Sequence, residues 1–66
     1  MKRYAIVNLN GISIEGLGDW ESLDAAFNEA VNLLAQGSST KIVQLPYQLG
    51  EEIFEEQDVY TLQYHG

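Results

Sequence analysis

Residues 22–37 read SLDAAFNEAVNLLAQG, and this stretch decides the fold. Ser22 is a preferred helix N-cap, and Asp24 in the first turn meets the positive end of the helix dipole. Asp19 is an alternative cap, which leaves the start open by about three residues. Gly37 is a candidate left-handed residue at the C-terminal end. The spacing i, i+3, i+4 predicts one apolar stripe, made of Leu23, Ala26, Phe27, Ala30, Val31 and Leu34.

Upstream of this helix the pattern predicts two strands. Residues 3–9 contain good strand formers, and Asn10-Gly11 follows as the dipeptide typical of a two-residue type I′ hairpin turn. In residues 12–17 apolar and polar side chains alternate, which indicates a half-buried second strand with one wet face.

Downstream of the helix the pattern is less regular. Residues 41–45 predict a third strand, which Pro46 ends or places at a sheet edge. Residues 47–50 are expected to form a loop, and residues 51–57 one or two helical turns. Residues 58–64 predict a last strand, with Tyr60, Leu62 and Tyr64 on one face.

These elements predict an α+β fold of order β-β-α-β-(short α)-β, a single small globular domain over residues 1–66. A three- to four-stranded, mainly antiparallel sheet would carry the one helix on one face. The other face has no second helix to cover its apolar residues, so self-association is expected. The predicted core consists of Ile6, Ile12, Ile14, Leu23, Phe27, Ala30, Val31, Leu34, Val43, Leu45, Ile53, Tyr60 and Leu62.

Charge is the most unusual property of this chain. It carries ten acids and three bases, which gives a formal net charge of −7 on 66 residues. Such a surface repels nucleic acid and anionic membrane and attracts basic surfaces. There is no cysteine, which excludes disulfides and thiolate metal sites. We expect a cytoplasmic protein, with a phage-infected bacterial host as one setting, because the sequence shows no signal-peptide core or membrane-spanning run.

The densest acidic cluster lies in residues 51–58, where five acids surround Ile53 and Phe54. One interpretation is a solvated face that keeps a small protein soluble. The other is a binding surface for a basic cleft, with an apolar anchor among the charges. A divalent-cation site is disfavoured because the Asp/Asn-plus-Gly loop of an EF-hand is absent.

A second acidic set includes Glu21 and Glu29, and each of its members has an ordinary structural explanation. Their joint lack of nearby bases in the sequence predicts counterions on another macromolecule. Tyr47, in the expected loop, is a candidate exposed anchor, since tyrosine is enriched at interface hot spots. The candidate partner-binding residues are Glu51, Glu52, Phe54, Glu55, Glu56, Asp58, Tyr47, Glu21 and Glu29.

Carboxylates on strands and helices can be spaced similarly to the phosphates of DNA, which lie about 3.4 Å apart along each strand. In size and charge the chain resembles the very small acidic proteins of phages and mobile elements, some of which inhibit CRISPR and restriction systems. We therefore predict a non-enzymatic inhibitor that occupies a basic nucleic-acid-binding site on a partner protein. Neither direct nucleic-acid binding nor membrane binding is expected.

The alternative is a small interaction or assembly module, of antitoxin or adaptor type, that pairs through sheet edges or an apolar face and can form a homodimer. No cofactor, metal or catalytic residue is predicted. His65 lies next to the C-terminus without an orienting partner in the sequence, and the serines lie in no nucleophile motif.

Overall fold

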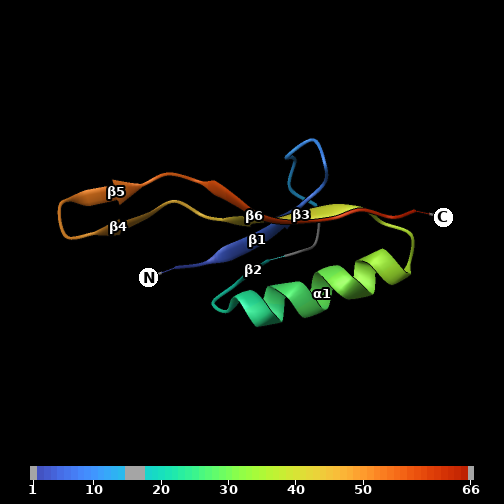
Figure 1. The fold of residues 1–66 in the computed structure, drawn as a ribbon. Helices are drawn as coiled ribbons and strands as arrows, with labels where there is room; N and C mark the ends of the chain where they lie inside the picture. The colour runs from blue at the N-terminus through green and yellow to red at the C-terminus, as the bar shows by residue number, and fades with distance from the viewer. Residues whose placement is uncertain (1, 15–17, 66) are drawn as a thin grey trace.

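An antiparallel sheet in the order β2-β1-β3-β6 carries the helix α1 on one face (Figure 1). The computed structural model describes residues 2–14 and 18–65. A separate two-stranded sheet pairs β4 with β5. The predicted α+β class, the antiparallel sheet and the helix are confirmed. The elements are β1 (Tyr4–Val7), β2 (Asp19–Trp20), α1 (Leu23–Ala35), β3 (Thr40–Gln44), β4 (Tyr47–Leu49), β5 (Glu52–Phe54) and β6 (Gln57–Leu62).

Both ends of α1 are closed as the sequence predicts. The Ser22 hydroxyl oxygen accepts a hydrogen bond from the Ala25 N–H at 3.2 Å. Gly37 has φ +89°, and its N–H donates to the Leu34 carbonyl. The Ser38 N–H donates to the Leu33 carbonyl, which completes a Schellman motif. Asp24 lies in the first turn, where its charge favours the helix dipole.

The turn after β1 differs from the predicted type. The Asn8 N–H donates to the Ile12 carbonyl, and the Asn8 carbonyl accepts from the Gly11 N–H. This is a three-residue loop with Gly11 in the left-handed region (φ +83°), the conformation of a G1 bulge. Asn8 Oδ1 also accepts from the N–H groups of Asn10 and Ile12, so the Asn8 side chain stabilises the longer turn.

The second strand that the structure describes lies later than predicted. On the side of β1 away from β3, the described residues that pair with it are β2 at Asp19–Trp20 and Ser13, which forms an isolated bridge with Val7. Residues 15–17, which belong to the predicted strand 12–17, lie outside the described residues. Because β2 pairs Trp20 with Tyr4, the chain enters α1 directly from the sheet edge.

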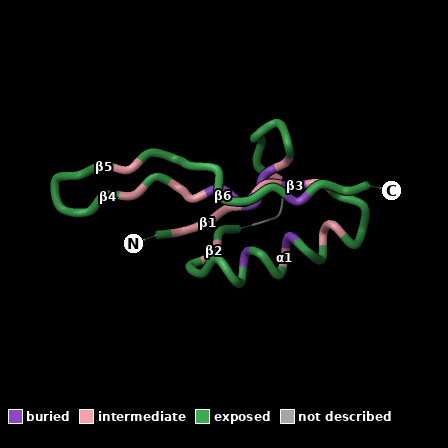
Figure 2. The backbone as a smooth tube through the Cα atoms, in the orientation of Figure 1, coloured by how far each residue is buried: buried purple, intermediate pink, exposed green. Residues whose placement is uncertain are grey.

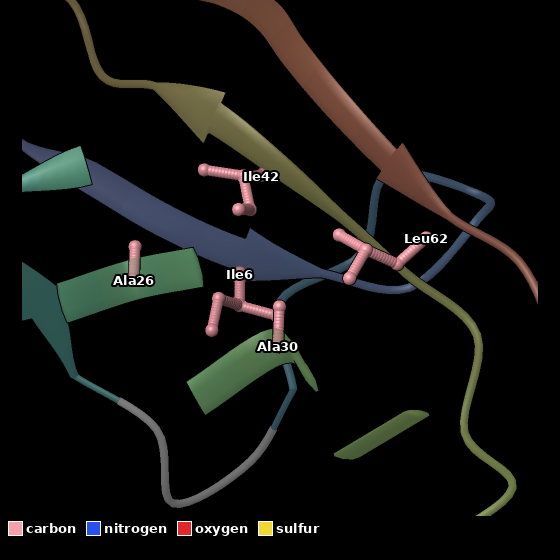
Figure 3. Close-up of a cluster of buried hydrophobic side chains, with 5 residues drawn as sticks. All are labelled: Ile6, Ala26, Ala30, Ile42 and Leu62. Atoms are coloured by element: carbon pink, nitrogen blue, oxygen red, sulfur yellow. The ribbon is translucent and has the colours of Figure 1, made fainter. Parts of the chain in front are cut away.

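The core lies between α1 and the middle of the sheet (Figures 2 and 3). Its buried members are Ile6, Ala26, Ala30, Ile42 and Leu62. The alanines let the helix approach the sheet closely, so the buried stripe is centred on them. Predicted core residues that are instead largely or partly exposed are Ile12, Leu23, Phe27, Val31, Ile53 and Tyr60.

The face of the sheet opposite α1 agrees only in part with the prediction. Among the described residues no helix covers the face opposite α1 (Figure 1). Val7 and Val43 are nevertheless buried, and by strand alternation they point to that face. Among the described residues, the most exposed apolar side chains lie outside these strands, at Ile12 in the turn after β1 and at Leu49 and Ile53 on the β4–β5 hairpin. Among the described residues no helix is long and apolar enough to cross a membrane.

A bulge in β6 changes the face on which Asp58 lies. Ile42 pairs with Tyr60, but the next residue, Val43, pairs with Asp58, so Val59 is the extra residue. Without it, alternation would put Asp58 on the helix face with Tyr60. The bulge instead moves Asp58 to the side of Lys41, and Lys41 Nζ lies 3.3 Å from Asp58 Oδ2.

The short helix predicted over residues 51–57 is wrong, and so is the loop at 47–50. Both segments belong to a β-hairpin, with Tyr47 opposite Phe54 and Leu49 opposite Glu52. The helix would have placed like charges at i, i+4 and would have been only two turns long. So few backbone hydrogen bonds do not offset the unfavourable free energy of helix nucleation. The hairpin gives Tyr47 and Phe54 a partner that the helix lacked.

Candidate functional site

The β4–β5 hairpin projects from one end of the sheet (Figure 1). We call residues 47–56 the acidic arm. Within the described residues, β4 and β5 contact no other strand or helix. The arm lengthens the molecule, whose principal extents are 45 × 21 × 19 Å. A segment held only at its base presents both faces and its tip to a partner.

The tip of the acidic arm is a two-residue turn made of Gly50 and Glu51. Gly50 has φ +63°, which a type II′ turn requires at its first central position. Gln48 Nε2 donates to the Gly50 carbonyl oxygen at 3.0 Å. The turn thus fixes Glu51 at the far end of the molecule.

The two faces of the acidic arm differ. Tyr47 and Phe54 stack on one face, with ring centroids 4.6 Å apart and planes 9° from parallel. Lys2 Nζ lies 6.0 Å from the Tyr47 ring centroid, at the limit of a cation–π contact. Register places Leu49 on the same face as the rings and Ile53 on the other.

The apolar anchor differs from the expected one. Tyr47 was predicted as an exposed anchor in a loop, but it lies half-buried in a strand. Phe54 is also half-buried, against the Tyr47 ring. The exposed apolar side chains of the arm are Ile53 (72%) and Leu49 (67%). Sequence reasoning missed Leu49, although a glycine between two short alternating segments is a hairpin signal.

Four glutamates lie on this arm: Glu51 at the tip, Glu52 in β5, and Glu55 and Glu56 at the base. All four are exposed, and none makes an ion pair or a side-chain hydrogen bond with the other described residues. Four negative charges therefore surround Leu49 and Ile53 without internal neutralisation.

Other carboxylates do have internal partners, which corrects the expectation that the acids of this chain lack them. Arg3 Nη2 and Nε bind the two carboxylate oxygens of Asp19 at 2.7 and 2.8 Å. Arg3 Nη1 lies 3.1 Å from Glu21 Oε1. With the Lys41–Asp58 pair, Arg3 and Lys41 are both engaged within the sheet, away from the arm.

The Arg3–Asp19 pair is bidentate, the geometry that gives strong charge-assisted hydrogen bonds. The hydrogen bond from Arg3 lowers the pKa of the Asp19 carboxyl below its usual value. The same contact raises the pKa of the Arg3 guanidinium, which stays charged.

The structure brings together only part of the predicted site. Glu51, Glu52, Phe54, Glu55 and Glu56 gather on the acidic arm, together with Tyr47. Asp58 lies just beyond it in β6 but is paired with Lys41. Glu21 is paired with Arg3, and Glu29 is half-buried on α1. Because α1 has no contact with the arm, these last two belong to another surface.

The described residues form no pocket and no group of three or more His, Asp or Glu side chains placed to hold a metal ion. His65 is exposed next to the C-terminus. The geometry that is present consists of a projecting hairpin with charged and apolar side chains, which suits contact with a macromolecular surface.

The chain matches no protein-family model, no curated protein and no solved structure.

Proposed function

We propose that this chain is a non-enzymatic binding protein whose acidic arm occupies a basic, nucleic-acid-binding site on a partner protein. The observation that carries the proposal is the segregation of charge. Glu51, Glu52, Glu55 and Glu56 are exposed on a projecting hairpin, while Arg3 and Lys41 neutralise carboxylates of the sheet. A partner with basic side chains would supply the counterions that the glutamates of the arm lack.

The shape of the arm supports insertion into a groove. Residues of a strand rise about 3.3 Å each, close to the rise of about 3.4 Å per nucleotide along the axis of DNA. Glu51 and Glu52 are adjacent at the tip, and Glu55 and Glu56 are adjacent at the base. Two pairs of negative charge along a narrow hairpin resemble a short stretch of nucleic-acid backbone.

The arm also offers contacts that nucleic acid does not. Leu49 and Ile53 are exposed beside the glutamates and would be desolvated against apolar parts of the partner. Charge would then speed association, and the two apolar side chains would slow dissociation. A competitor of this kind occupies the partner's nucleic-acid-binding site without imitating a nucleobase.

The proposal is tested first by capture. The immobilised chain is exposed to host lysate, and retained proteins are eluted with salt or with an unrelated DNA duplex. A retained nucleic-acid-binding protein that both salt and DNA release supports the proposal, because both compete with carboxylates for the same bases. Retention that neither salt nor DNA disturbs contradicts it.

Two double variants then localise the contact. Glu51→Gln with Glu52→Gln removes two negative charges from the arm, whereas Asn28→Lys with Asn32→Lys adds two positive charges to exposed positions of α1. The net charge changes equally in both. We expect the arm variant to lose about tenfold or more in affinity for the captured protein, and the helix variant to lose much less. Equal losses would mean that only net charge matters and would contradict a role for the arm.

A further inference from the structure

β6 is an open edge of the main sheet. It lies last in the strand order, and within residues 2–14 and 18–65 it pairs only with β3. It is the longest strand, with six residues, of which only Leu62 is buried. The opposite edge, β2, has only two residues. A long exposed edge strand presents unpaired N–H and C=O groups, which another strand can pair with.

The backbone groups that face outward can be assigned from one hydrogen bond. The Tyr64 N–H donates to Ser39 Oγ at 2.8 Å, and Ser39 directly precedes β3. Backbone groups of successive strand residues point to opposite sides, so Leu62 also faces β3 and Thr61 faces away. The N–H and C=O of Thr61 therefore lie at the open edge.

An apolar flank lies beside that edge, on the helix side of the sheet. It consists of Leu23, Phe27 and Val31 on α1 and Tyr60 on β6, with exposed fractions from 36% to 55%. Phe27 and Tyr60 touch edge to face, with ring centroids 5.3 Å apart. Large apolar groups left half-exposed next to an open strand indicate a surface that a further strand and its covering layer would bury.

The distribution of charge indicates which molecule can approach this surface. Two copies of a chain with net charge −7 repel each other over most of their surfaces. In β6 the only charged residue is Asp58, and Lys41 neutralises it. The apolar flank carries no charge. This region is therefore one where two copies can approach without bringing unpaired carboxylates together.

We propose that β6 pairs with β6 of a second copy, antiparallel across a two-fold axis at Thr61. Two open edges of identical sequence complement each other in this arrangement, and the contact closes after two chains. Asp58 then lies about 20 Å from its symmetry mate along the strands, beyond a Debye length at physiological salt. The four-stranded sheets join into one, with both helices on the same face.

The area that a stable dimer needs is a modest share of the surface of this chain. A standard interface buries about 800 Å² per partner, roughly a sixth of the 4692 Å² that this chain exposes. β6 and the apolar flank supply backbone edge and side chains along the full length of the strand. Because the strands run antiparallel, the two acidic arms point to opposite ends, and the dimer contact is independent of the proposed function of the arm.

The test uses sedimentation equilibrium with a matched pair of variants. Thr61→Pro removes the central N–H, which an edge strand tolerates when that group faces away from its sheet. Thr61→Val keeps the N–H. We expect the native chain and Thr61→Val to be dimers at tens of micromolar, and Thr61→Pro to dissociate at least about tenfold more readily with unchanged circular dichroism. A native monomer, or a Thr61→Pro dimer as tight as the native one, overturns the proposal.

A cross-link keeps the proposal testable if Thr61→Pro fails to fold. The chain has no cysteine. In a hydrogen-bonded antiparallel pair the Cα atoms are about 5.5 Å apart, which a disulfide can span. Mild oxidation should convert Thr61→Cys rapidly to a covalent dimer and Glu51→Cys, at the arm tip, only slowly. Equal rates for the two variants overturn the two-fold pairing.

Salt separates this proposal from that for the arm. Screening reduces repulsion between two acidic chains, so the dimer should tighten as salt rises, whereas binding of the arm to a basic partner should weaken. Glu51→Gln with Glu52→Gln should leave the dimer intact. The two proposals can thus fail separately. A Glu51→Gln/Glu52→Gln variant that binds the captured protein as tightly as the native chain contradicts the proposal for the arm, whereas a Thr61→Pro variant that dimerises as tightly contradicts the proposal for β6.

Discussion

The sheet with its helix and the acidic arm are held together in different ways. In the sheet and helix, side chains from β1, β3, β6 and α1 bury one another, and Ile42 is completely enclosed. In the arm, Tyr47 and Phe54 stack as a pair, with no second layer among the described residues. The first region derives its conformation from a shared core, and the second from a turn and one aromatic contact.

The comparison shows that the shared core and the unpaired glutamates occupy separate parts of this molecule. Bases neutralise carboxylates at the sheet, where Arg3 joins two strands by binding Asp19. The arm keeps its glutamates unpaired and its apolar side chains exposed, neither of which stabilises a fold. Substitutions should therefore have different effects in the two regions, and the following predictions test that difference.

The largest expected effect is the contrast between two isoleucines. Ile42→Ala opens a cavity at a fully buried position and should cost about 2–5 kcal/mol of unfolding free energy. Ile53→Ala, at a position 72% exposed, should stay within about 0.5 kcal/mol. Urea denaturation measures both. Similar losses in the two variants would show that the arm belongs to the cooperative core.

Two glycines with positive φ give the next contrast. A Cβ at Gly37 or at Gly50 would meet no other atom within 4 Å, so alanine costs only backbone strain, about 1 kcal/mol. Gly37 closes α1, so Gly37→Ala should lower the global free energy of unfolding. Gly50→Ala should loosen the arm alone, seen as faster amide exchange in β4 and β5. Faster exchange in β3 as well would contradict this separation.

Removal of an aromatic ring from the arm should have a smaller and strictly local effect. Phe54→Ala abolishes the stack with Tyr47, a contact worth about 0.5–1.5 kcal/mol. Amides of β4 and β5 should exchange faster, while the urea midpoint of the core stays unchanged. Phe54→Leu serves as the control, since it keeps apolar bulk but not the stacking. A shift of the global midpoint in Phe54→Ala would show coupling between the regions.

The smallest effect concerns pH. Because Arg3 lowers the pKa of folded Asp19, this carboxylate stabilises the fold above the usual Asp value of 3.8. The contribution is lost as the pH falls from there through the lowered pKa. Asp19→Asn should flatten the acid limb of the stability curve. Carboxyl chemical shifts measured during an NMR titration report the pKa of Asp19 directly.

The sequence predicts α1 and its position on the sheet well, because burial of one face gives the apolar residues of a helix a regular spacing. The helix between Ser22 and Gly37 is found with both caps, since capping depends on local hydrogen bonds that residue type alone indicates. The position of the core within the stripe was less predictable. Ala26 and Ala30 lie innermost because small side chains allow close packing, whereas Phe27, a predicted core residue, is 36% exposed.

The arm could not be predicted in the same way. Each of its strands has three residues, too few for alternation to differ from a helical turn. The ion pairs of Arg3 and Lys41 depend on strand register and on the bulge at Val59, which are tertiary properties. Local pattern therefore located the acidic cluster of the candidate site but gave it the wrong secondary structure and did not predict which acids are neutralised.

The lack of contact between β4–β5 and the other strands and helix of the described chain also bears on how such a protein can change over generations. Selection for folding acts weakly on residues 47–56, because few of their substitutions disturb the core. Variation there is constrained mainly by the contacts that the hairpin makes with other molecules. If the arm binds a partner as proposed, an altered tip, or a hairpin longer by two residues, would let the same scaffold follow changes in that partner.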